Sequence, residues 1–391
     1  MRFLQCLQNF LHMDLSYSKD LIRTPDFSDA KKLVWLNLER CSSLLEVDPS
    51  ISVLDSIPYL KLNGCSNLRK FPNISGNMKE LRDLSLDESA IIEVPSSVND
   101  LPGLKTLSLR KCRELRSLPS SIHMESLQKL DLSGCSKLAE FPEISEVMER
   151  LTILYLDETE IEKLPSSIIF FTSLRKLSMR RCRSLVYLPE EMFNLACLQD
   201  LDLTDCSKME KLPENSLGAE TTATGSGIKQ LPIWILGMGW WWSVSFKGCK
   251  ELTAPFSSWP TWNPQIHSGS FLSELDLSDC NLLELSDAIA HLSSLKLLNL
   301  SGNKNLESLP AAMNRLFHLC GLKVEGCTRL KSIPELSSSV EEIYANDCTS
   351  LETVSAPLNR GKYLTFANCV RLQQVTTNLF IDTVETSIVN R

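Results

Sequence analysis

Cysteine is the residue type in this sequence that most invites a chemical role. The 391 residues include fourteen cysteines, which could form disulfides, bind zinc or supply a nucleophile. Eleven of them recur at one position of a repeated pattern: Cys41, Cys65, Cys112, Cys135, Cys182, Cys206, Cys249, Cys280, Cys327, Cys348 and Cys369. Equivalent side chains of stacked repeats run parallel, whereas a disulfide needs them to converge, and spacings of 20-odd residues do not suit zinc. We therefore expect reduced, buried thiols with a structural role.

The other reactive residue types form no catalytic pattern. The sequence contains no phosphate-binding glycine loop, no H-E-x-x-H and no paired C-x-x-C, and its five histidines are scattered. This predicts a protein that is not an enzyme and holds no cofactor or metal. The net charge of −8 disfavours a nucleic acid or an anionic membrane as partner. A secretory leader and a membrane-spanning stretch are both absent from the sequence.

Charged residues suited to recognition recur in bands of alternating sign. Eight of them make up the first candidate binding site: Asp87, Glu88, Arg110, Lys111, Asp157, Glu158, Arg180 and Arg181. One interpretation is a solvated face joined by weak surface ion pairs. The other, which we favour, is a charge pattern that selects a protein partner by electrostatic complementarity.

These residues are positioned by a repeated unit, of which LQKLDLSGCSKLAEFP, residues 127–142, is a clear copy. Leu130 and Leu132 alternate with polar residues, so the pattern predicts a short strand with leucines turned inward and polar residues outward. Cys135 falls where the chain leaves the strand, which suits a small side chain able to make a weak hydrogen bond. The unit follows the leucine-rich-repeat pattern, and it must stack on its copies to bury its leucines.

The second strand leucine of each unit serves as the reference position. The reference positions are Leu15, Leu38, Leu62, Leu86, Leu109, Leu132, Leu156, Met179, Leu203, Phe246, Leu277, Leu300, Val324, Ala345 and Phe366. A degenerate copy near Ala223 brings the prediction to about sixteen repeats. The predicted fold is an α/β leucine-rich-repeat solenoid, with a curved parallel sheet inside and short helices or turns outside. We expect one array over residues 1–376, irregular at 213–270, and a cap or truncated tail over 377–391.

The segments between strands carry two further expectations. Pro95-Ser96-Ser97-Val98, Pro119-Ser120-Ser121-Ile122 and Pro165-Ser166-Ser167-Ile168 have the composition of capped helix starts. The last two intervals shrink to 21 residues, which leaves room only for an extended or tightly turned outer segment.

Six of the seven tryptophans lie within residues 234–262, beside the degenerate repeat. These rings either patch a gap in the core or form an exposed anchor for a partner. Trp259 and Trp262 are accordingly the second candidate binding site.

Several strings in combination carry a family resemblance. They are the opening MDLSYSKDLIRTPDFS, the recurring L-x-L-x-x-C-x-x-L, the LPSSI segments, the shorter repeats that begin DES and DET, and the 21-residue units. Together they resemble the leucine-rich-repeat region of plant intracellular immune receptors of the TIR, nucleotide-binding, leucine-rich-repeat class. The resemblance implies recognition of a pathogen effector, directly or through a host protein, and restraint of the receptor's nucleotide-binding domain. Reduced thiols without an export signal separately point to the cytoplasm, and with it the nucleus, as location.

The TIR and nucleotide-binding motifs of that class are absent from these residues. We therefore expect a fragment, a partial gene model or a receptor-like protein without signalling modules, and no catalytic activity. Three other functions stay open. The first is a cytosolic leucine-rich-repeat scaffold for signalling proteins, and the second is a receptor ectodomain, which would need an export signal, flanking cysteine pairs and many sequons. The third is an enzyme that joins such repeats to a ubiquitin ligase, which would need a catalytic cysteine domain after the repeats.

Overall fold

The structure, a computed structural model, describes residues 9–74, 78–209, 243–250, 252–256, 272–355, 363–372 and 374–376. The chain forms two compact units, Met1–Leu198 and Gln199–Arg391. The degenerate repeat near Ala223, both tryptophans of the second candidate site and the expected tail over 377–391 lie outside the described residues. Two short pieces of the irregular stretch, residues 243–250 and 252–256, are described.

A parallel sheet runs through the first unit. Its strands, in spatial order, are β1 (His12–Asp14), β2 (Trp35–Asn37), β3 (Tyr59–Lys61), β4 (Asp83–Ser85), β5 (Thr106–Ser108), β7 (Lys129–Asp131), β9 (Ile153–Tyr155) and β10 (Lys176–Ser178). The middle residues pair across strands, so that Leu130 aligns with Leu107 and Leu154. These leucines are almost completely buried. The predicted parallel solenoid is confirmed.

The second unit repeats the same construction. Its strands are β11 (Asp200–Asp202), β12 (Ser243–Ser245), β13 (Glu274–Asp276), β14 (Leu297–Asn299), β15 (Gly321–Lys323), β17 (Glu342–Tyr344) and β19 (Tyr363–Thr365). In both units every strand of the sheet ends one residue before a predicted reference position. The register inferred from the sequence is therefore confirmed for all repeats that the structure describes.

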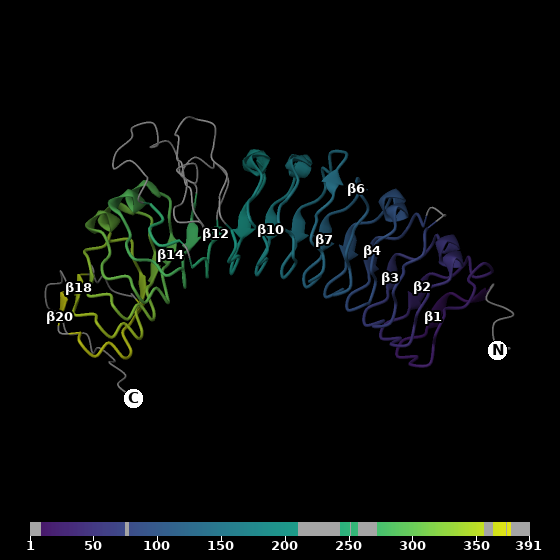
Figure 1. The fold of residues 1–391 in the computed structure, drawn as a ribbon, viewed down its shortest axis with the longest axis horizontal. Helices are drawn as coiled ribbons and strands as arrows, with labels where there is room; N and C mark the ends of the chain where they lie inside the picture. The colour runs from purple at the N-terminus through teal and green to yellow at the C-terminus, as the bar shows by residue number, and fades with distance from the viewer. Residues whose placement is uncertain are drawn as a thin grey trace. The chain divides into compact units, whose positions relative to one another are not determined.

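The outer segments are single turns of 3₁₀ helix or short strands, with the helices along the outer rim (Figure 1). The helices are η2 (Pro49–Val53), η3 (Ser96–Asp100), η4 (Ser166–Phe170), η5 (Glu190–Asn194), η8 (Asp287–His291) and η9 (Ala311–Arg315). The short outer strands are β6 (Ser121–Ile122) and β8 (Glu143–Ile144) in the first unit, and β16 (Ser332–Ile333), β18 (Thr353–Ser355) and β20 (Gln374–Thr376) in the second. The extended segments expected of the two 21-residue intervals are confirmed by β16 and β18.

One of the expected helix starts is wrong. Helices η3 and η4 follow Pro95 and Pro165 as predicted, but the segment after Pro119 forms β6 and pairs with β8. Pro119 lies eight residues before Leu127, the first leucine of the following repeat. The equivalent leucines lie nine residues after Pro95 and Pro165. The shorter segment leaves less chain for a helical turn, and the extended form gains backbone hydrogen bonds from its neighbour.

The serines of these segments do not cap their own helices. Neither η3 nor η4 has a side-chain cap. Instead, Ser97 Oγ accepts a hydrogen bond from Ile74 N at 2.9 Å, and Ser167 Oγ accepts one from Ile144 N at 2.9 Å. The serines therefore join neighbouring repeats.

The repeat-position cysteines join each repeat to the preceding one. Cys135 Sγ donates to the carbonyl oxygen of Leu109 at 3.1 Å, and Cys327 Sγ donates to that of Leu300 at 3.2 Å. All eleven are free thiols, and all are buried except Cys369, which is partly exposed. The expected burial is confirmed for ten of the eleven, and each of the two thiols above donates to the carbonyl of the preceding repeat's reference residue, which fits a structural role.

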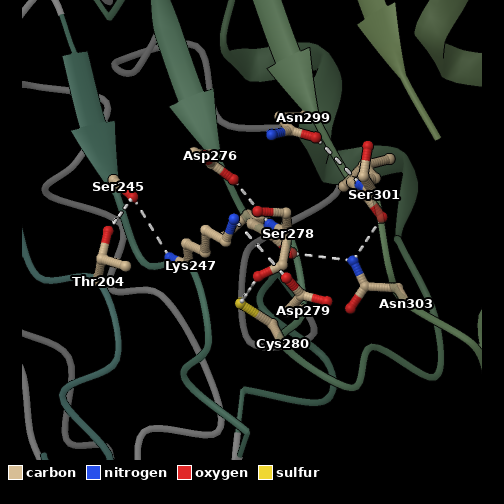
Figure 2. A network of polar contacts seen from close by, with 12 residues as sticks. Thr204, Ser245, Lys247, Asp276, Ser278, Asp279, Cys280, Asn299, Ser301 and Asn303 are labelled. Atoms are coloured by element: carbon tan, nitrogen blue, oxygen red, sulfur yellow. Dashed lines mark hydrogen bonds and ion pairs between the residues drawn. The ribbon is translucent and has the colours of Figure 1, made fainter. Parts of the chain in front are cut away.

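Asn303 occupies the cysteine position in its repeat and makes more contacts there. Its Nδ2 donates to the carbonyl oxygens of Leu277 at 2.9 Å and Leu300 at 2.6 Å, and its Oδ1 accepts from Leu282 N at 3.0 Å. Figure 2 shows this residue beside Cys280 of the preceding repeat. Asparagine thus satisfies three backbone groups where cysteine satisfies one.

Candidate protein-recognition face

The eight charged residues of the first candidate site all lie in the first unit, in the turns that follow four of its strands. Strand β4 ends at Ser85 and β5 at Ser108, so the reference leucine and the charged pair come after the strand. Asp87, Arg110, Asp157 and Arg180 take the first position after the reference residue, and Glu88, Lys111, Glu158 and Arg181 take the second. The structure therefore places these charges along one edge of the sheet face.

The second turn position has a left-handed backbone throughout the first unit. Its φ angle lies between 56° and 80° at Tyr17, Arg40, Gly64, Glu88, Lys111, Gly134, Glu158 and Arg181. This conformation aims the N–H at the next repeat, as Glu88 N does toward the carbonyl oxygen of Arg110 at 2.7 Å. A side chain here costs roughly 1–2 kcal/mol relative to the right-handed conformation, and glycine avoids that cost. Charged residues thus occupy positions where glycine would adopt the same backbone conformation at lower cost.

The two aspartates of the site brace the following turn. Asp87 Oδ1 accepts from Ser108 Oγ at 2.6 Å and from Arg110 N at 2.9 Å. Asp157 makes the matching bonds to Ser178 Oγ at 2.5 Å and Arg180 N at 2.9 Å. Their carboxylates therefore have a structural use, which the sequence pattern did not reveal.

Other repeats brace the turn from the strand itself. Figure 2 shows two examples in the second unit, where Asp276 Oδ1 accepts from Ser278 N at 2.8 Å and Asn299 Oδ1 accepts from Ser301 N at 3.1 Å. Strands β5 and β10 end in serine, and the turns after them are instead braced by Asp87 and Asp157 of the preceding repeat. This substitution explains why DES and DET repeats precede serine-ended strands.

The residues at the second turn position form ion pairs between repeats. Lys111 Nζ lies 3.1 Å from Glu88 Oε1, and Arg181 Nη1 lies 3.0 Å from Glu158 Oε1. All four side chains are 52–58% exposed. Exposed pairs of this kind contribute about 0–1 kcal/mol, so the fold gains little from them.

The strand face beside these turns combines charge with apolar surface. Lys129 and Ile153 begin β7 and β9, and Tyr155 ends β9 with Lys129 Nζ 5.2 Å from its ring centroid. Asp131 was expected among the outward polar residues. It does face outward, but only 4% of it is exposed, because Lys129 Nζ at 3.5 Å and Arg110 Nε at 3.9 Å lie against its carboxylate.

Outward aromatic residues are a part of the face that the sequence analysis missed. In the first unit the rings of His12 and Trp35 lie 6.4 Å apart, and Tyr59 is 47% exposed. In the second unit Tyr344 and Tyr363 lie 5.5 Å apart. All five occupy outward positions of strands, so the same alternation that placed the leucines inward would have identified them.

The charged residues at the outward strand and turn positions of the second unit are mainly acidic. The acidic residues are Asp200, Asp202, Asp205, Glu274, Asp276, Asp279, Glu325, Glu341, Glu342 and Asp347, and the basic ones are Lys247, Lys296 and Lys323. Two of them approach each other, with Lys247 Nζ 3.9 Å from Asp279 Oδ2 (Figure 2). The sequence analysis proposed no site on this unit's described residues.

The described part of the chain holds no candidate metal site. No group of three or more histidine, cysteine, aspartate or glutamate side chains there could hold a metal ion. Burial raises the pKa of Cys112 to about 11 and that of Cys65 to about 12, so these thiols stay protonated and unreactive at neutral pH. Across the described ranges no helix has the length and apolar character to cross a membrane.

Comparison with known proteins shows that the repeats are similar to those of plant resistance proteins. Residues 123–223 match the family model "Disease resistance protein RPS4B-like, leucine-rich repeats", and residues 271–292 match the Leucine Rich Repeat model. TMV resistance protein N of Nicotiana glutinosa is 30% identical over 92% of this chain and 27% of its own length. Disease resistance-like protein DSC1 of Arabidopsis thaliana is 36% identical over 94% of this chain and 28% of its own length. The chain thus spans about a quarter of these relatives.

Solved structures support the fold alone. The APL1 leucine-rich repeat domain superposes with a TM-score of 0.52 at 16% identity, covering 85% of this chain and 78% of that one. A chain of the LRIM1/APL1C complex gives a TM-score of 0.51 at 15% identity, covering 85% of this chain and 55% of that one.

Proposed function

We propose that this chain, a leucine-rich-repeat array similar over most of its length to plant disease resistance proteins, is the recognition module of an intracellular immune receptor. In this role it binds a pathogen effector or an effector-modified host protein. It also contacts the receptor's own nucleotide-binding domain and restrains its signalling switch. The module itself is non-catalytic and works in the cytoplasm or nucleus.

The observation that carries the proposal is the set of charged side chains at left-handed turn positions. Glu88, Lys111, Glu158 and Arg181 occupy a position that glycine fills elsewhere in the same unit. Their ion pairs are exposed and contribute little to stability. The left-handed conformation of these residues costs stability that their ion pairs do not recover, which supports a role for the side chains in binding.

The arrangement suits a protein partner better than a small molecule. The two ion pairs lie at separate repeats along the sheet edge, and positive and negative groups alternate between them. Such a pattern can select a partner with the complementary alternation and repel one with the wrong sign.

The test reverses the charge of Arg180 and Arg181 to Glu in a complete receptor that carries this array. Effector-dependent cell death and partner pull-down are scored together, and circular dichroism checks the fold. We expect an intact fold and partner binding weakened by about 1 kcal/mol or more.

The matched control is Lys31→Glu with Lys32→Glu, two exposed residues of the same unit that precede β2 and make the same change in charge. This control should keep full response. Full response and full binding in the Arg180/Arg181 variant would contradict the proposed site and make Trp259 and Trp262 the next candidate.

A further inference from the structure

The face formed by β7, β9 and β10 in the first unit has more positive charge than its carboxylates neutralise. Asp131 already has Lys129 and Arg110 within 3.9 Å. Asp157 braces the turn after β10, and Glu158 is paired with Arg181. The negative groups of this face are therefore engaged within the protein.

Three cations beside them have no such partner. Within the ranges that the structure describes, the side chains of Lys105, Arg175 and Lys176 make no ion pair or hydrogen bond. Arg175 is exposed, and the other two are partly exposed. The charge that this face offers to a partner is thus positive, although the two signs alternate in the sequence.

Strand register places an apolar side chain at the centre of the face. Ile153 of β9 aligns with Lys129 of β7 on one side and with Lys176 of β10 on the other. Adjacent strands lie about 4.8 Å apart, so the two lysines are roughly 10 Å from each other with Ile153 between them. Tyr155, two residues along β9, points to the same side and extends the apolar surface.

We propose that this face binds an acidic protein segment with an apolar side chain between its carboxylates. The apolar group packs on Ile153 and Tyr155, while the carboxylates reach Lys176, Arg175 and Lys105. Extended chain rises about 3.3 Å per residue and alternate side chains face the same side, so carboxylates four residues apart, with the apolar residue midway, span about 13 Å. Lys105 and Arg175 hold equivalent positions three strand spacings apart, about 14 Å, which matches this separation. The assignment rests on the proposed function, because it names the partner chemistry of the same recognition face.

A protein segment fits this face better than a nucleic acid does. A phosphate backbone presents uniform negative charge, and Asp131 and Asp157 lie on or directly after β7 and β9 of this face. A peptide can place its few carboxylates at the free cations and avoid these aspartates.

The test measures fluorescence anisotropy of a labelled short peptide with a central leucine flanked by glutamates, added to the full chain. The native chain should bind this peptide, and binding should weaken as salt is raised. Arg175→Glu with Lys176→Glu should weaken binding at least tenfold. Lys31→Glu with Lys32→Glu, which makes the same charge change elsewhere in the unit, should leave it within twofold.

Variant peptides and a nucleic acid separate the components of the proposal. Replacing the leucine of the peptide by serine, or Ile153 by Ser in the protein, should weaken binding severalfold, and replacing the glutamates by lysines should abolish it. Circular dichroism establishes that each protein variant is folded. Tighter binding of an oligothymidylate than of the acidic peptide would overturn the proposal in favour of a polynucleotide.

Two other outcomes also overturn the proposal. One is equal binding of the acidic and basic peptides, and the other is an unchanged affinity in the Arg175/Lys176 variant. If the acidic peptide fails to bind while Arg180/Arg181 reversal still reduces the receptor's response, the recognition function stands and this class of partner is wrong.

Discussion

The two units share one core and differ in the charge of their outward positions. The first unit's strands and turns mix both signs, with basic residues Arg40, Lys61, Arg82, Lys105, Arg110, Lys111, Lys129, Arg175, Lys176, Arg180 and Arg181 among its acidic ones. At the corresponding described positions of the second unit, the charged residues are mostly aspartate and glutamate. Buried leucines fix the strand register in both, so the core leaves surface charge free to differ. We infer that the difference reflects what each face contacts.

The first prediction tests whether the cores are equivalent, and it carries the largest expected effect. Burial raises the thiol pKa to about 11 for Cys182 and to about 12 for Cys65 in the first unit, and to about 12 for Cys249 and Cys327 in the second. Folded thiols therefore stay protonated above pH 9, where thiols of the unfolded chain lose their protons. Stability is fully present below pH 9 and falls as the pH rises from 9 toward 11, by about 1.4 kcal/mol per thiol and pH unit.

Urea denaturation from pH 8 to 10.5 measures this loss, and circular dichroism follows both units. A Cys65→Ala and Cys249→Ala variant should show a shallower pH dependence. In the native state at pH 8, thiol labelling should reach the exposed Cys197 and Cys320 but not the buried repeat cysteines. All fourteen should react after denaturation. A midpoint independent of pH would contradict the role given to the buried thiols.

The second prediction concerns the leucine core of each unit. Leu132→Ala and Leu300→Ala each remove a completely buried side chain, and each should cost about 2–5 kcal/mol through the cavity that is left. Hydrogen exchange should rise in the repeats next to the altered one, because each repeat contacts chiefly its neighbours. Lys32→Ala, on the surface, should change stability by less than about 0.5 kcal/mol. Equal exchange everywhere would show that the arrays do not unfold locally.

The third prediction compares the two side chains that close the turns. Asn303→Ala removes three hydrogen bonds and leaves the carbonyl of Leu277 and the N–H of Leu282 without partners, which should cost about 1–3 kcal/mol or more. Cys135→Ala loses one weak thiol bond and should cost about 1 kcal/mol. Denaturation midpoints measure both. Asn303→Cys should recover part of the loss, and a cost for Cys135→Ala above that for Asn303→Ala would contradict the hydrogen-bond argument.

Register and burial were the parts of the fold that the sequence predicted well. Two inward leucines per repeat and a cysteine at fixed spacing leave one register in which the apolar residues are covered. The outer segments were less predictable, as Pro119 illustrates. Its segment differs from the helical ones by one residue in length, and the choice of an extended form also depends on the neighbouring segment, which the local sequence does not specify.

The sequence predicted where the charged residues of the candidate site lie, but not what each side chain does. The sequence identified the charged bands but could not separate Asp87, which braces a turn, from Glu88, which faces solvent, because both are acidic and adjacent. The burial of Asp131 depends on Lys129 and Arg110, one of them contributed by another repeat. Which side chains of neighbouring repeats come into contact depends on how the repeats stack. The sequence pattern within a single repeat does not predict those contacts.

The last prediction concerns the second turn position, where the expected effect on stability is smallest. Replacing Glu158 and Arg181 by glycine relieves the left-handed strain of two side chains, removes one exposed ion pair and adds freedom to the unfolded chain. These contributions oppose one another, so stability should change by less than about 1 kcal/mol. Urea denaturation measures it, beside Gly134→Ala as a control. That control should be clearly destabilising, since its Cβ would lie 3.1 Å from Lys111 Cγ.

The same glycine variant decides whether these side chains serve recognition. If Glu158 and Arg181 are kept for a partner, the variant should fold normally and bind the receptor's partner at least fivefold more weakly, with a reduced dependence on salt. Replacing Glu88 and Lys111 by glycine should act in the same direction at the neighbouring ion pair. Native binding by both variants would show that the turn charges are dispensable. Recognition by the first unit would then depend on the strand row of Lys129, Ile153 and Lys176, where no backbone constraint competes with the choice of side chain.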